Sequence, residues 1–133
     1  MSTYTFIIKQ GKTFERRFEY KTGSPPTPFD FTGYEVRAQI RPQPGSPVVY
    51  CTLSSSIQPD GTGFNMTPLS GSVVLPRSSG SIGMVISAFS SSQFNFDSGY
   101  IDIEFYSGSG VNQYVKELVS GKVKVIKEVT TIG

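Results

Sequence analysis

Apolar and polar residues alternate along many short segments of the chain. The clearest is Tyr34 to Arg41, where the even positions are apolar and the odd positions are charged or amidic. Successive side chains of a β-strand point to opposite faces, so this pattern predicts a strand with one face on a core and one in water. The same alternation predicts strands at Thr13 to Tyr20, Tyr100 to Phe105 and Gly121 to Val125.

Weaker alternation predicts further strands and brings the total to about nine. These are Tyr4 to Lys9, Val48 to Leu53, Ser72 to Leu75, Ser81 to Ser87 and Asn112 to Val119. Glycine, proline and serine separate the segments, which favours tight turns between them. A spacing of roughly eight to twelve residues is typical of a β-sandwich or barrel.

Three connections have more specific signatures. Ser107 to Gly110 joins two strand-like segments and predicts a hairpin tip, and Ser120–Gly121 predicts a turn before the last strand. Ser87 to Phe96 has roughly helical spacing of its apolar residues and predicts one short helical turn. Arg16 interrupts the apolar row of its segment, which indicates a sheet edge or an interface there.

Composition supports an all-β protein of one domain. The 133 residues include 14 Gly and 9 Pro, and charged residues make up 17%, below the roughly 25% of an average soluble domain. Residues with high helix propensity, such as Ala, Leu, Glu and Lys, are scarce. We therefore expect one domain over residues 1–133, with about eight to nine short antiparallel strands and at most one short helical turn.

The sequence argues against catalysis and against metal or cofactor binding. It contains no His and only one Cys, which removes the commonest general base and the usual zinc ligands. Cys51 lies in an apolar segment and is expected to be a small packed side chain. The serines Ser78, Ser79 and Ser90 to Ser92 have no base near them in the sequence.

Two groups of charged residues are candidates for a functional role. Asp102 and Glu104 leave the same face of one strand, which would suit glycoside hydrolysis or a divalent cation. A solvated face paired with a basic residue on the next strand is the favoured interpretation. Phe14 and Phe18 lie among basic residues, an arrangement seen in single-strand nucleic-acid sites, but their parity places them in the core.

Partners are constrained by charge and hydropathy. The net charge of +2 is too small to indicate a nucleic-acid partner. No apolar run approaches 18 residues and no signal peptide is present, so we expect no membrane partner and synthesis in a cytoplasm. Residues 1–41 and 112–133 are net basic and residues 42–111 are net acidic.

The ordered motifs of the chain resemble those of a small β-sandwich found in virion proteins of tailed bacteriophages. They are Gln10–Phe14, Phe29–Arg41, Gly99–Phe105, Val119–Val125 and Glu128–Thr130, and the resemblance covers about residues 6–130. In such virions the sandwich forms the particle-facing part of baseplate upper proteins and tail-fibre attachment proteins. The resemblance implies an Ig-like antiparallel sandwich with short N- and C-terminal arms.

The function implied by the resemblance is structural. We expect a baseplate or tail adaptor, present in multiple copies in the virion, that joins neighbouring virion proteins or anchors fibres. The chain ends at Gly133 without the coiled coil or receptor-binding head of a fibre protein, which favours an adaptor, plug or decoration subunit. A capsid decoration protein and a carbohydrate-binding β-sandwich remain the alternatives.

The interface is expected at sheet edges and chain ends. Its candidate residues are Tyr4, Phe6, Ile8, Arg16, Lys124 and Lys127. An apolar N-terminal strand either pairs within its own sheet or adds to the sheet of a neighbour. On this hypothesis, deleting Met1 to Ile8 weakens incorporation into particles more than it lowers the melting temperature.

Overall fold

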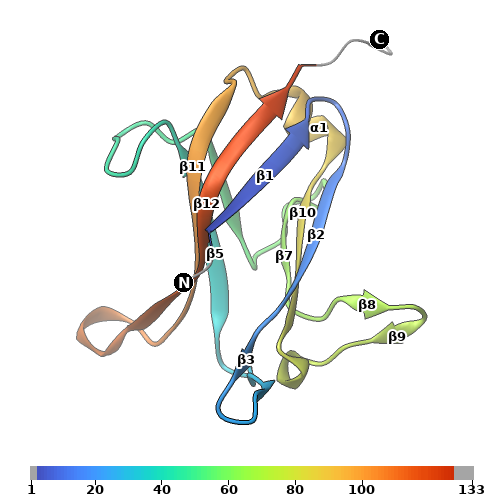
Figure 1. The fold of residues 1–133 in the computed structure, drawn as a ribbon, viewed down its shortest axis with the longest axis vertical. Coiled ribbons are helices and arrows are strands. Elements are labelled where there is room, and N and C mark those ends of the chain that lie inside the picture. The colour runs from blue at the N-terminus through green and yellow to red at the C-terminus, as the bar shows by residue number, and fades with distance from the viewer. Residues whose placement is uncertain (1–2, 128–133) are drawn as a thin grey trace.

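Two facing β-sheets form the body of the molecule (Figure 1). The computed structural model describes residues 3–127. The strands and helices lie in chain order as follows: β1 (Thr3–Lys9), β2 (Phe14–Glu19), β3 (Lys21–Thr22), β4 (Thr27–Pro28), β5 (Glu35–Arg41), β6 (Cys51–Ser54), β7 (Gly63–Asn65), β8 (Leu69–Ser70), β9 (Val73–Val74), the 3₁₀ turn η1 (Arg77–Ser79), β10 (Ser81–Ile86), α1 (Ala88–Ser92), β11 (Ser98–Ser107), the 3₁₀ turn η2 (Gly110–Asn112) and β12 (Tyr114–Ile126).

The larger sheet has the order β1-β12-β11-β5-β6 and the smaller has the order β2-β10-β7. This arrangement is Ig-like, because β12-β11-β5-β6 and β2-β10-β7 correspond to the G-F-C-C′ and B-E-D strands of a variable-type domain. The expected all-β sandwich is confirmed. The antiparallel expectation has one exception, since β1 runs parallel to β12, from Thr3 opposite Ser120 to Lys9 opposite Ile126.

The core lies between the two sheets and is built from the inward residues of the alternating segments. Its fully buried large side chains are Phe6, Ile8, Phe31, Ile40, Leu53, Phe64, Ile82, Met84, Ile86, Ile101, Ile103 and Phe105. At one end, Tyr20, Phe29, Phe31 and Tyr34 surround Phe105, with ring centroids 5.2–5.7 Å from it. Aromatic pairs at such distances add stability beyond the area that they bury.

Two strand predictions are wrong and one strand was missed. Val48 and Val49 are exposed and precede β6, which begins at Cys51. The segment Ser72 to Leu75 contributes only the two-residue strand β9, which belongs to neither main sheet. Strand β7 was missed because Gly63 and Asn65 flank a single apolar Phe64, which leaves no alternation to detect.

The expected turn at Ser120–Gly121 is also wrong, because β12 runs through it without interruption. Gly121 lies opposite Tyr4 of β1. A Cβ atom added at Gly121 would lie 2.1 Å from the backbone oxygen of Tyr4. The glycine therefore permits the close approach of β1, and no turn is formed there.

Other connections follow the sequence. The Tyr34 N–H donates to the Phe31 carbonyl over 2.9 Å in a turn where Gly33 has a φ of 86°. The hairpin expected at Ser107 to Gly110 joins β11 to β12. The helical turn expected within Ser87 to Phe96 is α1, whose first turn is capped by Ser87 accepting from the Ser90 N–H.

Candidate functional site

The predicted interface residues of the N-terminal strand belong largely to the core. Phe6 and Ile8 are fully buried, because β1 pairs with β12 of its own sheet and directs both side chains inward. Their assignment to a protein interface is therefore wrong for this fold. Tyr4 is half-buried and packs on the core.

Arg16 lies at an edge, as its break in the apolar row indicated. Strand β2 is an outer strand of the smaller sheet. The Arg16 guanidinium carbon lies 5.2 Å from the ring centroid of Tyr4, 5.7 Å from that of Phe6 and 6.0 Å from that of Phe18. The cation therefore covers aromatic rings at the opening between β1 and β2 while it remains exposed to water.

The two predicted lysines lie near the end of β12. Lys124 is exposed and lies opposite Ile7 of β1 and Ser98 of β11. Lys127 Nζ lies 3.7 Å from Asp97 Oδ1 and donates to the Phe96 carbonyl over 3.2 Å. Both are available at the surface, whereas Met1, Ser2 and residues 128–133 of the predicted terminal arms lie outside the described residues.

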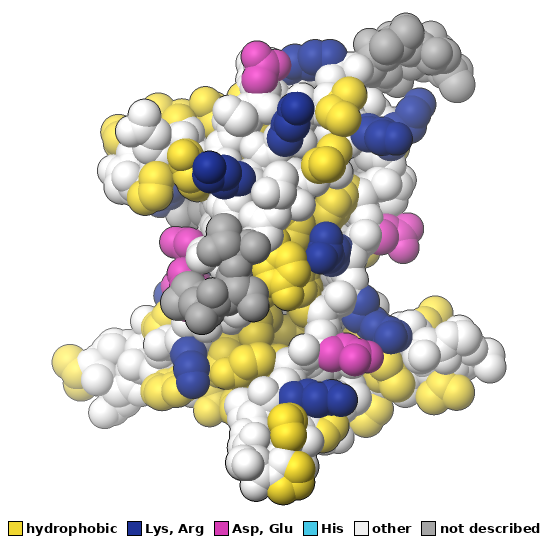
Figure 2. Space-filling model, viewed as in Figure 1, with side chains coloured by type: hydrophobic (Ala, Val, Ile, Leu, Met, Phe, Trp, Pro, Cys, Tyr) yellow, Lys and Arg dark blue, Asp and Glu magenta, His cyan; other side chains and the backbone are white. Residues whose placement is uncertain are grey.

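The hairpin β8–β9 projects from one end of the sandwich and carries exposed apolar side chains (Figures 1 and 2). Leu69, Val73 and Val74 are 62%, 60% and 59% exposed. The strands pair Leu69 with Val74, and Gly71 supplies the positive φ of 63° that the tight turn needs. Such a concentration of exposed apolar residues indicates a contact surface.

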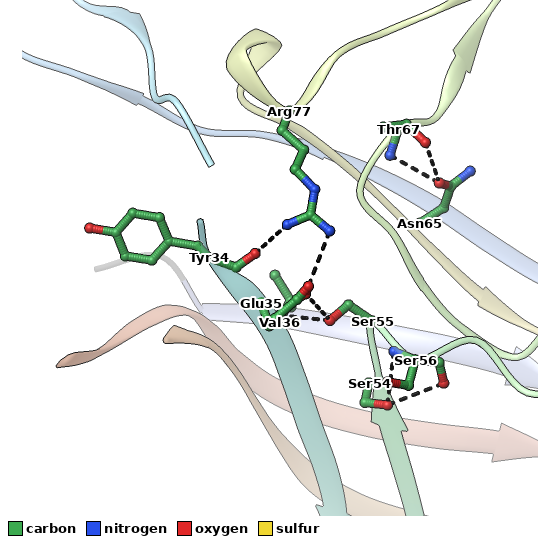
Figure 3. A network of polar contacts seen from close by, with 9 residues as sticks. All are labelled: Tyr34, Glu35, Val36, Ser54, Ser55, Ser56, Asn65, Thr67 and Arg77. Carbon is green, nitrogen blue, oxygen red and sulfur yellow. Dashed lines mark hydrogen bonds and ion pairs between the residues drawn. The ribbon is translucent and has the colours of Figure 1, made fainter. Parts of the chain in front are cut away.

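The base of this hairpin is fixed to the sandwich. The Leu75 N–H donates to the Pro68 carbonyl over 2.8 Å. Arg77, in the turn that follows, donates to the Tyr34 carbonyl and forms an ion pair with Glu35 at 3.1 Å (Figure 3). Glu35 also accepts from Ser55 Oγ over 3.1 Å. The Leu75–Pro68 hydrogen bond closes the base of the hairpin, and the Arg77 contacts join the turn η1 that follows it to the start of β5.

The hairpin between β11 and β12 is a second projection at this end of the molecule (Figure 1). Val111 is fully exposed at its tip, and Tyr114 and Val115 on its β12 side are also exposed. The two projecting hairpins therefore present six apolar side chains to solvent. Sequence reasoning identified the second hairpin but assigned no contact role to either.

The outer face of the larger sheet contains a groove of about 830 Å³. Strand register arranges its side chains in three rows across β5, β11 and β12. The first row is Arg41, Tyr100 and Lys122, the second is Gln39, Asp102 and Ser120, and the third is Arg37, Glu104 and Glu117. Thr52 of β6 extends the second row. Pro44 and Gly45 form a wall of the groove.

A β-bulge brings a third carboxylate into the groove. The register of β12 shifts opposite Ile103 and Glu104, so that Glu117 lies opposite Glu104. Burial raises the pKa of Glu117, and the charges of Asp102 and Glu104 and a hydrogen bond with Asp102 add to this shift. The position of Glu117 beside Asp102 and Glu104 could not be predicted from the sequence, because a bulge reverses the parity on which face assignment depends.

Glu104 is paired as the favoured interpretation expected. Arg37 Nε donates to Glu104 Oε1 over 2.6 Å, and the Arg37 guanidinium lies 4.4 Å from the ring centroid of Tyr106. Asp102 and Glu104 therefore differ in their surroundings, since the second has a cationic partner and the first neighbours Glu117. Within residues 3–127, no group of three His, Cys, Asp or Glu side chains has an arrangement that could hold a metal ion.

A polar cluster joins the Asp60 loop to α1. Asp60 Oδ2 accepts from Ser87 Oγ over 2.6 Å and from Ser90 Oγ over 2.5 Å, and Asp60 Oδ1 accepts from the Thr62 N–H over 3.1 Å. Ser90 therefore has a carboxylate neighbour that its sequence surroundings did not reveal. These hydrogen bonds lower the pKa of Asp60 well below its usual value, so the carboxylate is a poor base and the cluster anchors the loop.

Cys51 packs against the core. Burial raises the pKa of its thiol to about 11, and the charge of Asp60 adds to the effect. The thiol is therefore protonated at neutral pH and is not an activated nucleophile.

Comparisons with known proteins do not identify a family. The sequence matches no protein-family model, and a search of curated proteins finds no similar chain. In the part of the chain from Thr3 to Lys127, no helix has the length and apolar character needed to cross a membrane.

Proposed function

We propose that this protein is a structural subunit of a tailed-phage virion, an adaptor in the baseplate or tail that joins neighbouring virion proteins. The observation that carries the proposal is the pair of projecting hairpins with six exposed apolar side chains. Clusters of exposed apolar side chains are typical of protein contact sites. The ordered motifs described above, which resemble particle-bound sandwich modules, supply the virion context.

The structure changes where the contacts are expected. The N-terminal strand completes the sheet and contributes Phe6 and Ile8 to the core, so its main role is in stability. The hairpins β8–β9 and β11–β12 are the principal contact elements instead. Lys124 and the other surface lysines would orient an acidic partner more than they would add affinity. The proposed role requires no catalysis, no cofactor and no nucleic-acid or membrane partner.

The test is to look for the chain in purified particles. Virions produced from the genome that encodes this chain are purified on a density gradient, and their proteins are quantified by mass spectrometry. We expect the chain in several copies per particle, with a non-virion protein of the same genome as the negative control. Absence of the chain from purified particles would contradict the proposal.

Cryo-electron microscopy of the same particles separates the two structural alternatives. Density for the sandwich at the baseplate or tail supports the adaptor. Density on the capsid surface instead supports a decoration protein, which would use the same hairpins to contact capsid subunits.

A further inference from the structure

The groove on the outer face of the larger sheet is open to solvent and lined by side chains of β5, β6, β11 and β12. Its volume of about 830 Å³ lies within the range of small-molecule binding sites. The loop that forms its wall is held in place, because Arg41 donates to the Ser46 carbonyl and the Tyr50 N–H donates to the Ile40 carbonyl over 2.7 Å. Tyr50 also stacks on Phe96, with ring centroids 4.1 Å apart and an interplanar angle of 5°.

The position of the groove argues against an extended peptide as its ligand. Peptides commonly add to sheets through the main-chain groups of an edge strand. The groove lies mainly over β5, β11 and β12, each of which has a strand on both sides, and it reaches the edge strand β6 only at Thr52. Their main-chain groups are already used in the sheet, so a ligand must be recognised by side chains.

The charge of the groove argues against a polyanion. Three cationic side chains line it, Arg37, Arg41 and Lys122. Three carboxyl groups line it too, those of Asp102, Glu104 and Glu117. The carboxylates would repel a nucleic acid or a sulfated chain even though the cations attract it. A neutral ligand is not repelled by either set of charges.

The remaining chemistry of the groove suits polyols. Tyr100 is 39% exposed and presents an aromatic ring to the groove. The neighbouring row supplies the carboxylate of Asp102, the hydroxyl of Thr52 and the amide nitrogen of Gln39, whose oxygen accepts from Arg41 over 2.5 Å. A pyranose ring has an apolar face that can pack on an aromatic ring, and its hydroxyls both donate and accept hydrogen bonds.

We propose that this groove binds a neutral oligosaccharide, with one sugar ring over Tyr100 and hydroxyls hydrogen-bonded to Gln39 and Asp102. Asp102 shares a hydrogen bond with Glu117, but a carboxylate has several acceptor sites and can also accept from a sugar hydroxyl. It has no basic partner among the ion pairs of residues 3–127. The site lies on a different part of the molecule from the apolar hairpins. It therefore stands whether or not the chain is a virion protein.

The experiment is an NMR titration of the ¹⁵N-labelled full chain with three neutral hexasaccharides: maltohexaose, cellohexaose and chitohexaose. We expect at least one of them to shift amide signals of β5, β11 and β12 at concentrations up to roughly 10 mM, which covers Kd values in the millimolar range. No shift with any of the three, or shifts confined to other elements, would overturn the proposal. Stronger binding of a heparin hexasaccharide at these strands would overturn it too.

Matched variants test the assigned contacts. Tyr100→Ala and Asp102→Asn should each weaken binding about tenfold, whereas Tyr100→Phe should retain it because the ring remains. Asp97→Asn makes the same charge change on an exposed side chain outside the groove and should leave binding unchanged. Equal affinity of Tyr100→Ala, Asp102→Asn and the parent chain would contradict the assignment, and the ¹⁵N spectra of the free variants report whether each is folded.

Discussion

Strand β1 and the hairpin β8–β9 both carry apolar residues in short segments, yet only β1 buries them. β1 directs Phe6 and Ile8 into the core and leaves Ile7 half-exposed on the outer face. The hairpin exposes Leu69, Val73 and Val74. The difference arises from pairing, because β1 joins a five-stranded sheet whereas β8 and β9 pair only with each other. Apolar residues of the first kind stabilise the fold, and those of the second kind are available to a partner.

The largest effect on stability should come from truncating a buried side chain of β1. Phe6→Ala should lower the free energy of unfolding by about 3–5 kcal/mol, because it removes a fully buried ring and leaves a cavity. Urea denaturation of the purified chain measures the change. Leu69→Ala is the matched control and should stay within about 0.5 kcal/mol of the parent. Similar losses in both variants would show that the hairpin packs on the sandwich after all.

A substitution on β12 should weaken the pairing of β1 with that strand. Gly121→Ala places a Cβ against the Tyr4 backbone, so we expect a loss of about 1–3 kcal/mol, as for overpacked sites. Hydrogen exchange should show faster exchange of the β1 amides while β5 and β11 keep their protection. Lys122→Ala changes the exposed neighbour on the same strand and should not affect the β1 amides. Unchanged protection in Gly121→Ala would contradict the close approach.

The exposed side of the comparison is tested by the triple variant Leu69→Ser, Val73→Ser and Val74→Ser. We expect incorporation into particles to fall about tenfold, equivalent to about 1.4 kcal/mol, with the melting temperature unchanged because these side chains are exposed. Quantitative mass spectrometry of purified virions gives the occupancy. The double variant Val48→Thr and Val49→Thr removes exposed apolar groups elsewhere and should incorporate normally. Equal incorporation of both variants would remove β8–β9 from the interface.

The smallest expected effect on stability concerns the polar outer face of the larger sheet, which differs from both the buried β1 side chains and the exposed hairpin side chains. Because the pKa of Glu117 is raised in the folded chain, the folded state holds its proton to a higher pH than the unfolded state. Ionised Glu117 therefore costs stability above its folded pKa, and the cost disappears below the ordinary value of 4.5. Glu117→Gln should raise stability near neutral pH by less than about 1 kcal/mol, the range of exposed charge pairs.

The same carboxyl group can be followed directly by NMR. In Asp102→Asn, the pKa of Glu117 should move down towards its ordinary value, because one of the charges that raise it has been removed. A Glu117 titration that is identical in Asp102→Asn and the parent chain would show that the bulge does not bring the two groups together.

The deletion hypothesis drawn from the sequence must be revised in the light of β1. Removing Met1 to Ile8 deletes two fully buried side chains and most of the ladder with β12. Its main expected effect is therefore a loss of stability, which would reduce incorporation indirectly. For this reason the hairpin variant is the cleaner test of the interface.

The sequence by itself determined the class of fold and the faces of the strongest strands. The alternation in Tyr34 to Arg41 and in Tyr100 to Phe105 is a local property of an extended chain, so Val36, Ile101 and Asp102 could be assigned to the correct faces without a partner strand. Turn chemistry was also local, as the positive φ of Gly33 shows. The groove itself was not predicted, although the alternation placed Tyr100, Asp102 and Glu104 on one outward face of their strand.

The tertiary structure decided which segments pair, and it decided the structural roles of Gly121 and Glu117. Gly121 resembles a turn residue in the sequence, but it permits the contact with Tyr4, which is more than 110 residues away. Glu117 joins Asp102 only through a bulge. Phe6 and Val73 differ in burial because their strands have different neighbours. Pairing depends on packing between segments far apart in the chain, and local alternation carries no information about those partners.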